Sequence, residues 1–229
     1  MADTRIHISL FSNIKHLLAL LLLLPLMAVA QPRLEQPEIY LGAYGGVTAS
    51  TVFFTPKVGG MSDLLKVPIG YTGGLVFRYG GHKCCALQVE LAYAQRGWRE
   101  YSLSGGYDYT RTLHYIQLPV LAHIHFGNEH FRGFFNLGPQ LGYCVLEQEK
   151  GVRQTSSVYQ YNAIDHPFDW GVAGGLGFYG KSRNVGVFQL DLRAQYSFGS
   201  LYNNSRAEHF AASNMLTVGL TLAYMWQIR

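Results

Sequence analysis

The sequence predicts an all-β chain that folds into an eight-stranded antiparallel transmembrane β-barrel with up-and-down connections. Three observations predict this fold class: a period-two alternation of apolar and polar residues, connections that are alternately short and long, and an N-terminal export signal. Residues 1–30 are assigned to a cleaved signal peptide, and residues 31–229 to the barrel domain.

The N-terminal segment has the order of a secretory signal peptide. Arg5 and Lys15 precede the apolar run 17–24, and Ala28 and Ala30 supply small residues for a cleavage site. A membrane-anchor helix is the alternative, but the apolar run is short for a bilayer of about 30 Å. We therefore expect the mature chain to be exported.

The composition favours an outer-membrane barrel over an inner-membrane or soluble protein. Charged residues make up 14% of the chain, against roughly 25% in soluble domains. The chain also contains 16 tyrosines and 26 glycines, and no later segment has the length and apolarity of a transmembrane helix. The formal net charge of +4 is too small to indicate a nucleic-acid partner.

The first four predicted strands follow in order after the signal peptide. The first, 39–48, has an ambiguous facing because Gly42, Gly45 and Gly46 interrupt its alternation. The next three alternate strictly, which is the pattern of a strand whose two faces meet different surroundings. Their apolar rows are Tyr71, Gly73, Leu75, Phe77 and Tyr79; Leu87, Val89, Leu91 and Tyr93; and Ile116, Leu118, Val120, Ala122, Ile124 and Phe126.

The last four predicted strands continue this pattern to the C-terminus. It is clearest in the segment 188–199, FQLDLRAQYSFG, where Phe188 and Leu192 share the apolar face and Asp191 and Arg193 share the polar face. The other three apolar rows are Phe135, Leu137, Leu141 and Tyr143; Phe168, Trp170, Val172, Leu176 and Phe178; and Leu216, Val218, Leu220, Leu222, Tyr224 and Trp226.

The connections are sorted by length. An outer-membrane barrel has short periplasmic turns and longer extracellular loops, and from a periplasmic N-terminus every short connection falls on the periplasmic side. The sequence therefore predicts the outer membrane of a Gram-negative bacterium. The short connections are 80–83, 127–130 and 180–184, and the long ones are 49–70, 97–111, 146–167 and 200–213.

Aromatic residues at the strand ends indicate that the apolar rows face lipid. Aromatic girdles lie at both membrane interfaces of such barrels. A secreted lipocalin-like barrel is the alternative, but its interior rather than its exterior should be apolar. The predicted extracellular girdle is Tyr71, Tyr93, Tyr143, Trp170, Tyr196 and Phe198, and the periplasmic girdle is Tyr79, Phe126, Phe178, Phe188, Tyr224 and Trp226.

The polar faces predict a plugged lumen. Eight strands enclose only enough room for their own side chains, and buried charges need partners. Arg193 can reach Asp191 on its own face, and Arg78 and Glu90 point inward from other strands. We therefore expect these four residues to form a polar network that leaves no continuous water path. The inward face of the preceding strand is small, which gives these side chains room: Gly171, Ala173, Gly175 and Gly177.

Pro119 and Pro139 predict a local irregularity in the barrel wall. They are nearly equidistant from the turn at 127–130, and each removes a donor from the backbone ladder. We expect a bulge or similar irregularity between these two strands at mid-membrane depth.

Several segments, taken together, resemble the PorT-like outer-membrane β-barrel family. The resemblance runs from about Tyr40 to the end of the chain and implies an outer-membrane, non-enzymatic barrel. The name comes from a member needed for protein secretion, and most relatives have no assigned role. The segments are GYTGGLVFRY (70–79), LQVELAYAQRGW (87–98), YIQLPVLAHIHFG (115–127), FFNLGPQLGY (134–143) and FDWGVAGGLGF (168–178).

The residues that could carry metal or enzyme chemistry form no complete site. His123 and His125 share a strand face, but no third ligand is evident. His114 has lipid-facing parity, where a lipid-modifying enzyme could hold a catalytic histidine, yet no Ser or acid lies two residues away on that face. The odd set of three cysteines is no disulfide framework: Cys84, Cys85 and Cys144. We expect no cofactor, no metal and no enzyme activity.

Three functions remain open: a structural or binding barrel, an accessory subunit of a secretion or uptake complex, and a lipid-modifying enzyme. The expected partners are outer-membrane lipid, the barrel-assembly machinery, and a protein held by extracellular loops or periplasmic turns. Aromatic residues in two long loops form a candidate binding surface: Phe53, Phe54, Tyr159 and Tyr161.

Overall fold

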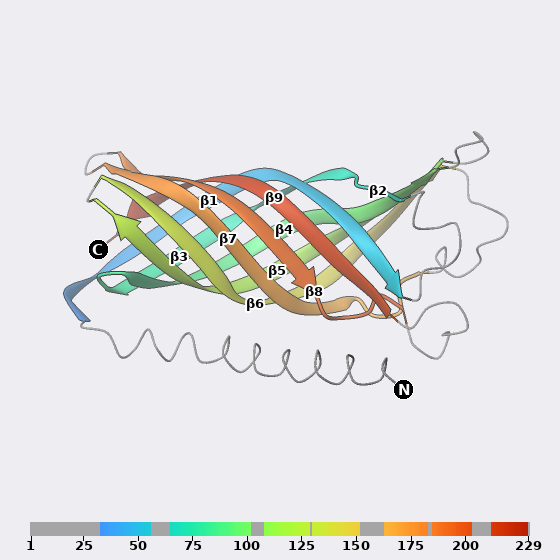
Figure 1. The fold of residues 1–229 in the computed structure, drawn as a ribbon, viewed down its shortest axis with the longest axis horizontal. Coiled ribbons are helices and arrows are strands. Elements are labelled where there is room, and N and C mark those ends of the chain that lie inside the picture. The colour runs from blue at the N-terminus through green and yellow to red at the C-terminus, as the bar shows by residue number, and fades with distance from the viewer. Residues whose placement is uncertain are drawn as a thin grey trace, which may run out of the picture.

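The computed structural model describes residues 33–55, 65–101, 108–128, 130–151, 163–182, 185–202 and 212–228. The predicted signal peptide, 1–30, lies outside this part of the chain. Nine strands are present in the described residues (Figure 1). They are β1 Arg33–Thr55, β2 Leu65–Lys66, β3 Ile69–His82, β4 Cys85–Tyr101, β5 Asp108–Gly127, β6 Phe131–Gly151, β7 Phe168–Ser182, β8 Gly186–Ser197 and β9 Ala212–Gln227.

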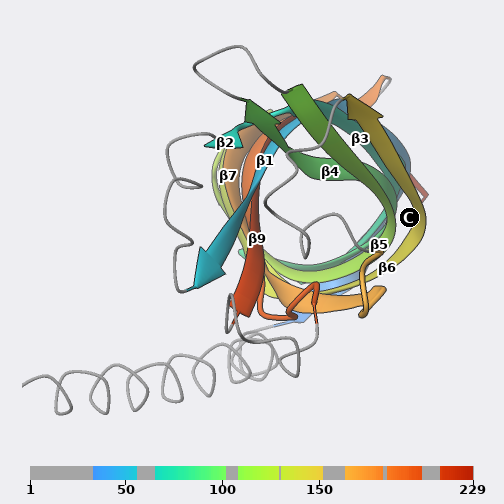
Figure 2. The ribbon, with the colours of Figure 1, turned by 90° about the vertical axis from the view of Figure 1, so that its right-hand side faces the viewer.

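Eight of these strands close into an antiparallel barrel, which confirms the predicted fold class. Each long strand pairs with its neighbours in the chain, and β1 pairs with β9 from Tyr40–Gln227 to Thr55–Ala212 to close the ring. Figure 2 shows this ring in end view. The short strand β2 pairs only with the end of β4. Closure satisfies the backbone groups of every long strand, which a bilayer requires.

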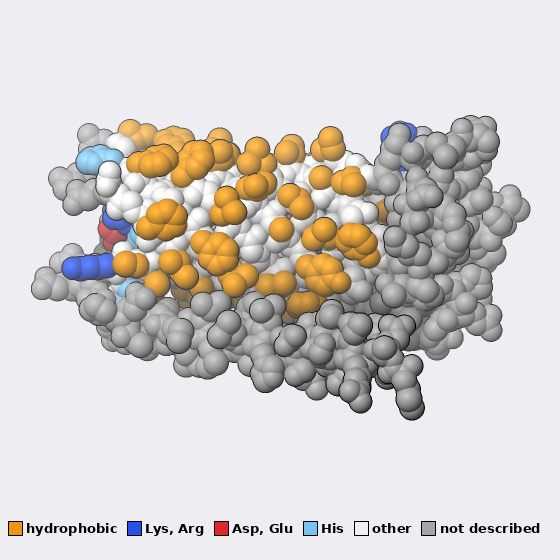
Figure 3. Space-filling view, in the orientation of Figure 1, with side chains coloured by type: hydrophobic (Ala, Val, Ile, Leu, Met, Phe, Trp, Pro, Cys, Tyr) orange, Lys and Arg blue, Asp and Glu red, His pale blue; other side chains and the backbone are white. Residues whose placement is uncertain are grey.

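The apolar rows face outward, as predicted. On β8, Phe188 and Leu192 are 50% and 49% exposed, whereas Asp191 and Arg193 are 1% and 6% exposed. Figure 3 shows apolar side chains spread over the visible barrel wall. A surface of this kind is stable in lipid rather than in water. It also excludes the lipocalin-like alternative, since the exterior is apolar and the middle of the interior is polar.

Aromatic side chains gather near the two ends of the apolar wall. Ring pairs include Tyr71–Tyr93, with centroids 5.9 Å apart, at the long-loop end. At the short-turn end, the centroids of Phe188 and Tyr224 lie 4.9 Å apart. These contacts agree with the two predicted girdles.

The three short connections lie at the same end of the barrel as the C-terminus (left in Figure 1). Two of them depend on glycine, because Gly127 and Gly186 have φ angles of 128° and 103°. L-residues rarely adopt such angles. A Cβ on Gly127 would also lie 2.7 Å from the carbonyl oxygen of Phe131.

The strands extend well beyond the predicted boundaries at the long-loop end. The segment 97–111, predicted as a loop, is largely strand: β4 continues to Tyr101, and the β4–β5 ladder runs out to the pair Tyr101–Asp108. β6 likewise continues to Gly151. Arg99, Gln148 and Lys150 are exposed there beside Leu146, so the strict apolar alternation stops although the backbone pairing does not.

The local irregularity predicted at the prolines is present, as an interruption of the pairing rather than as a bulge. The β5–β6 ladder runs to the pair Pro119–Gln140 and resumes at Ala122–Leu137 in the same register. The irregularity at Pro119 is thus a short gap in the pairing. A register shift occurs instead between His114 and Tyr115, toward the long-loop end.

The described residues contain no helix with the length and apolarity needed to span a membrane.

Candidate functional site

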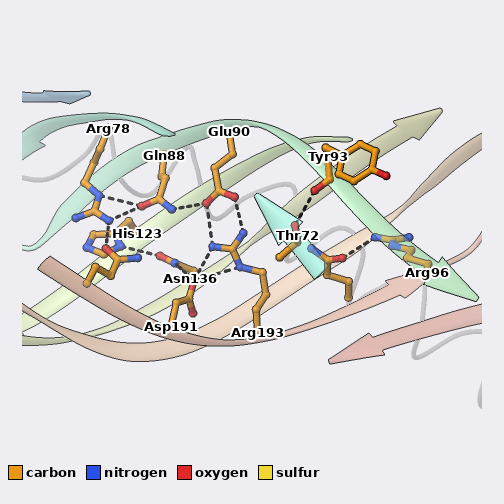
Figure 4. Close-up of polar contacts among 12 residues, drawn as sticks. Thr72, Arg78, Gln88, Glu90, Tyr93, Arg96, His123, Asn136, Asp191 and Arg193 are labelled. Atoms are coloured by element: carbon orange, nitrogen blue, oxygen red, sulfur yellow. Dashed lines mark hydrogen bonds and ion pairs between the residues drawn. The ribbon is translucent and has the colours of Figure 1, made fainter. Parts of the chain in front are cut away.

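The lumen is crossed by an ion-pair cluster centred on Arg193. Its guanidinium nitrogens lie 2.6 and 2.9 Å from the two carboxylate oxygens of Glu90, and Nη2 lies 2.5 Å from Oδ2 of Asp191. Arg193 is on β8 and Glu90 is on β4, which are opposite strands of the ring. A single bidentate contact therefore joins the two walls of the barrel (Figure 4).

Small residues on β7 make room for this cluster. Gly175 pairs with Arg193 in the β7–β8 ladder, and Gly177 pairs with Asp191. A Cβ on Gly175 would lie 2.6 Å from Oδ1 of Asp191, and one on Gly177 would lie 2.8 Å from Cζ of Phe134. The small face of β7 beside the charged face of β8 thus has a steric reason.

Neutral amides extend the cluster toward the short-turn end. Arg78 donates from Nε to Oε1 of Gln88 at 2.9 Å, and Gln88 donates to Glu90 at 2.5 Å. Arg78 also donates to the side-chain oxygen of Gln189, which lies on β8. The structure therefore joins all four predicted lumen residues, although Arg78 reaches the carboxylates only through glutamine side chains.

His123 adds an aromatic member to this cluster. Its Nδ1 lies 2.7 Å from Oδ1 of Asn136, and Asn136 donates in turn to Asp191 at 3.4 Å. Its ring is packed 4.8 Å from that of Phe134. His125 lies 5.6 Å from His123, ring centroid to ring centroid. The histidines are held by the amide and aromatic neighbours of the lumen.

A second ion-pair cluster, which was not predicted from the sequence, lies closer to the long loops. Arg96 on β4 contacts Asp169 on β7 at 3.0 Å and donates to Gln195 at 2.6 Å. Ser197 donates to the same Asp169 oxygen at 2.7 Å. The signal was present in the sequence, because Arg96 shares the inward parity of Glu90.

Apolar side chains close the lumen on both sides of the polar clusters. Neither layer was predicted from the sequence, because the inward faces were expected to be polar or small. Because these side chains point inward at both ends, they restrict water access to the buried ion pairs. The layer near the long loops is Val52, Trp98, Leu113, Tyr115, Cys144, Leu201, Tyr202 and Met215, and the layer near the short turns is Tyr40, Val76, Phe134, Tyr179, Val187 and Met225.

A further charged group lies above the long-loop layer. Arg111 forms ion pairs with Glu147 and Glu149 and donates to the hydroxyl of Tyr202 at 3.2 Å. Its guanidinium carbon lies 5.6 Å from the ring centroid of Trp98, a cation–π distance. Polar and apolar layers thus alternate along the lumen.

A cavity opens at the short-turn end, and Tyr40 and Tyr179 of the second apolar layer form part of its wall. Its volume is 390 Å³, and its walls come from strands on most of the ring. The lining residues are Glu38, Tyr40, Arg78, Gly80, His82, Lys83, Ala86, His125, Arg132 and Tyr179.

The candidate loop surface is only partly within the described residues. Phe53, near the end of β1, is 49% exposed. Phe54 belongs to the β1–β9 ladder opposite Ser213. Tyr159 and Tyr161 lie outside the described residues. The structure therefore does not bring these four aromatic residues together into one described surface.

The candidate chemical residues do not assemble into a metal site in the described part of the chain. No group of three His, Cys, Asp or Glu side chains there could hold a metal ion. His114 shares a hydrogen bond with the hydroxyl of Tyr93. Cys84, Cys85 and Cys144 form no disulfide within the described part of the chain; Cys84 is exposed and the other two are buried.

The closed ring, the apolar exterior and the charged interior define an outer-membrane β-barrel protein. Residues 29–203 match the family described as outer membrane protein beta-barrel domain, and the chain belongs to this family. The protein is therefore located in the outer membrane. No curated protein matches the chain.

Solved structures of outer-membrane proteins are similar to the chain at low sequence identity. Ail, the attachment invasion locus protein of Yersinia pestis, is 15% identical with a TM-score of 0.42, covering 82% of this chain and 99% of Ail. OprG from Pseudomonas aeruginosa is 14% identical with a TM-score of 0.46, covering 83% and 95%. Outer membrane protein W of E. coli is 15% identical with a TM-score of 0.38, covering 83% and 98%.

Proposed function

We propose that the protein is a non-enzymatic outer-membrane barrel with a plugged lumen, which acts through its surfaces rather than by conducting solutes. The observation that carries this proposal is the contact between Arg193 and Glu90 across the full width of the lumen. Removing one partner of a buried ion pair costs about 3–5 kcal/mol. The contact therefore resists the separation of the strands that an open channel would require.

The layers on both sides of Arg193 support the same proposal. A diffusing ion would have to pass the apolar layer containing Trp98, the two ion-pair clusters and the apolar layer containing Phe134. Both of these aromatic side chains are nearly fully buried. Apolar layers exclude hydrated ions because desolvating a charge is unfavourable.

We also propose that the protein is a PorT-like barrel and that residues 1–30 are its export signal. We propose that the extracellular loops serve surface structure or bind a partner. Phe53 supplies an exposed apolar side chain at the loop end of β1. Crosslinking in intact cells, followed by purification from native outer membrane, tests for such a partner; recovery of barrel-assembly components alone would count against the binding role.

Solute flux tests the plugged lumen. Protein reconstituted into liposomes should leave the permeability to small sugars and to potassium ions at the level of protein-free liposomes. A general porin reconstituted at the same density is the positive control. Flux that rises in proportion to the amount of protein would contradict the proposal.

A further inference from the structure

The cavity at the short-turn end has an unusual charge. Its lining includes Arg78, Lys83 and Arg132, but among the described residues Glu38 is its sole carboxylate. That carboxylate already has a cationic partner, since Nζ of Lys181 lies 2.8 Å from its Oε1. Figure 3 shows basic and histidine side chains at this end of the molecule, with acidic side-chain atoms beside them. The cavity therefore has more positive charge than its own acid can balance.

Arg78 presents a buried cation to the cavity that no described carboxylate contacts directly, although Glu90 and Asp191 lie near enough to offset part of its charge. It is 3% exposed, yet its hydrogen bonds go to the neutral amides of Gln88 and Gln189. Within the described residues no carboxylate lies within ion-pair distance of it, in contrast to Arg96 and Arg193. A buried arginine remains charged, so Arg78 attracts an anion that enters the cavity.

Arg132 faces the same cavity and is also bonded to neutral groups. It donates from Nη1 to Nε2 of His125 at 3.0 Å and from Nε to the carbonyl oxygen of Asn128 at 3.1 Å. Its Nη1 also lies 3.4 Å from the hydroxyl of Tyr179. Its position is thereby fixed while its charge remains available to a ligand.

We propose that this cavity binds a phosphate-bearing anion from the periplasmic side. Arginine forks match phosphate oxygens, and several converging cations favour a multiply charged anion. The cavity volume of 390 Å³ lies within the range of small-molecule sites. The ion-pair cluster above Arg78 closes the inner end, so the site is a pocket rather than an entrance to a channel. This inference goes beyond the proposed function and does not depend on the extracellular loops.

Calorimetric titration of the full mature chain in uncharged phosphatidylcholine nanodiscs tests the pocket with free pyrophosphate as probe. Saturable binding is expected, and it should weaken as salt is raised. Arg132→Gln should weaken binding by about ten- to one-hundredfold. Glu38→Gln should tighten it, because the pocket's own carboxylate repels the probe. Lys150→Gln removes an equal charge at the exposed long-loop end and should leave the affinity within about twofold.

A second arm distinguishes a free phosphate from a lipid headgroup. Nanodiscs that contain phosphatidylglycerol are analysed by native mass spectrometry for lipid retained on the protein. Retention by the native chain, lost in Arg132→Gln and kept in Lys150→Gln, would support the pocket with lipid as the source, even if pyrophosphate does not bind. The absence of binding in both arms, or equal binding by the native chain and Arg132→Gln, would overturn the proposal.

Discussion

Arg193 bonds to two carboxylates at once, and this makes its role different from that of either acid. Glu90 and Asp191 are both nearly fully buried, at 2% and 1% exposed. With Arg193 present, each has a partner. Without it, two carboxylates would share a closed space with no direct cationic partner on either of them. Among single residues, Arg193 therefore contributes most to the stability of the cluster.

Substitution should reveal this asymmetry. Arg193→Met should lower the free energy of unfolding by about 3–5 kcal/mol, because it leaves two buried acids. Asp191→Asn should cost less, about 1.5–3 kcal/mol, since Arg193 keeps its bidentate contact with Glu90. Urea unfolding in detergent micelles measures both. Equal losses, or a larger loss for Asp191→Asn, would contradict the assigned roles.

The sequence predicts the facing of residues that follow the strict alternation of a strand. Asp191 and Arg193 alternate with Phe188 and Leu192, so their inward facing could be predicted. Gln88 and Gln189 could not be identified as the partners of Arg78, because the partners depend on register and side-chain reach across the ring. Trp98 and Leu113 were missed for another reason: apolar inward residues break the rule that the lumen is polar.

β7 and β8 form a matched pair of elements. The inward glycines of β7 lie beside the long polar side chains of β8, and the pairing is regular from Gly171–Ser197 to Ser182–Gly186. Parity and the short connection together predicted this hairpin. The bulge next to Tyr115 was not predictable, since it depends on how β5 and β6 pair beyond the apolar band.

Adding a methyl group to the small face of β7 should destabilise the barrel. Gly177→Ala is expected to lower the free energy of unfolding by about 1–3 kcal/mol, because the new Cβ meets Phe134 and the carbonyl oxygen of Leu190. Gly45→Ala is the matched control, since its nearest neighbour would be Thr72 O at 3.9 Å. If thermal or urea unfolding shows that the two variants lose the same stability, the steric role of Gly177 is wrong.

The outward face of β8 can be tested by chemical labelling. In a variant lacking the native cysteines, Leu192→Cys should react with a lipid-soluble maleimide and resist a water-soluble one in intact membranes. Lys83→Cys, at an exposed turn position, should react with the water-soluble reagent once the periplasmic side is accessible. Rapid aqueous labelling at position 192 would reverse the assignment of the lipid face.

The whole molecule is organised in layers along the barrel axis. From the long loops to the short turns these are Arg111 with its acids, an apolar layer, two ion-pair clusters, and a second apolar layer that also forms part of the wall of the positively charged cavity. The closed barrel and its orientation could be predicted from alternation and loop length, which are local properties. The order of the layers arises only when distant strands meet around one axis.

The central claim is that this filled lumen does not conduct. Single-channel recording of the purified protein in planar bilayers tests it most directly. We predict that insertion, verified by recovery of folded protein from the membrane, gives no stable conductance steps in potassium chloride. Reproducible steps whose amplitude changes when Arg193 is replaced would contradict the account, because they would show ions passing the cluster that is proposed to close the barrel.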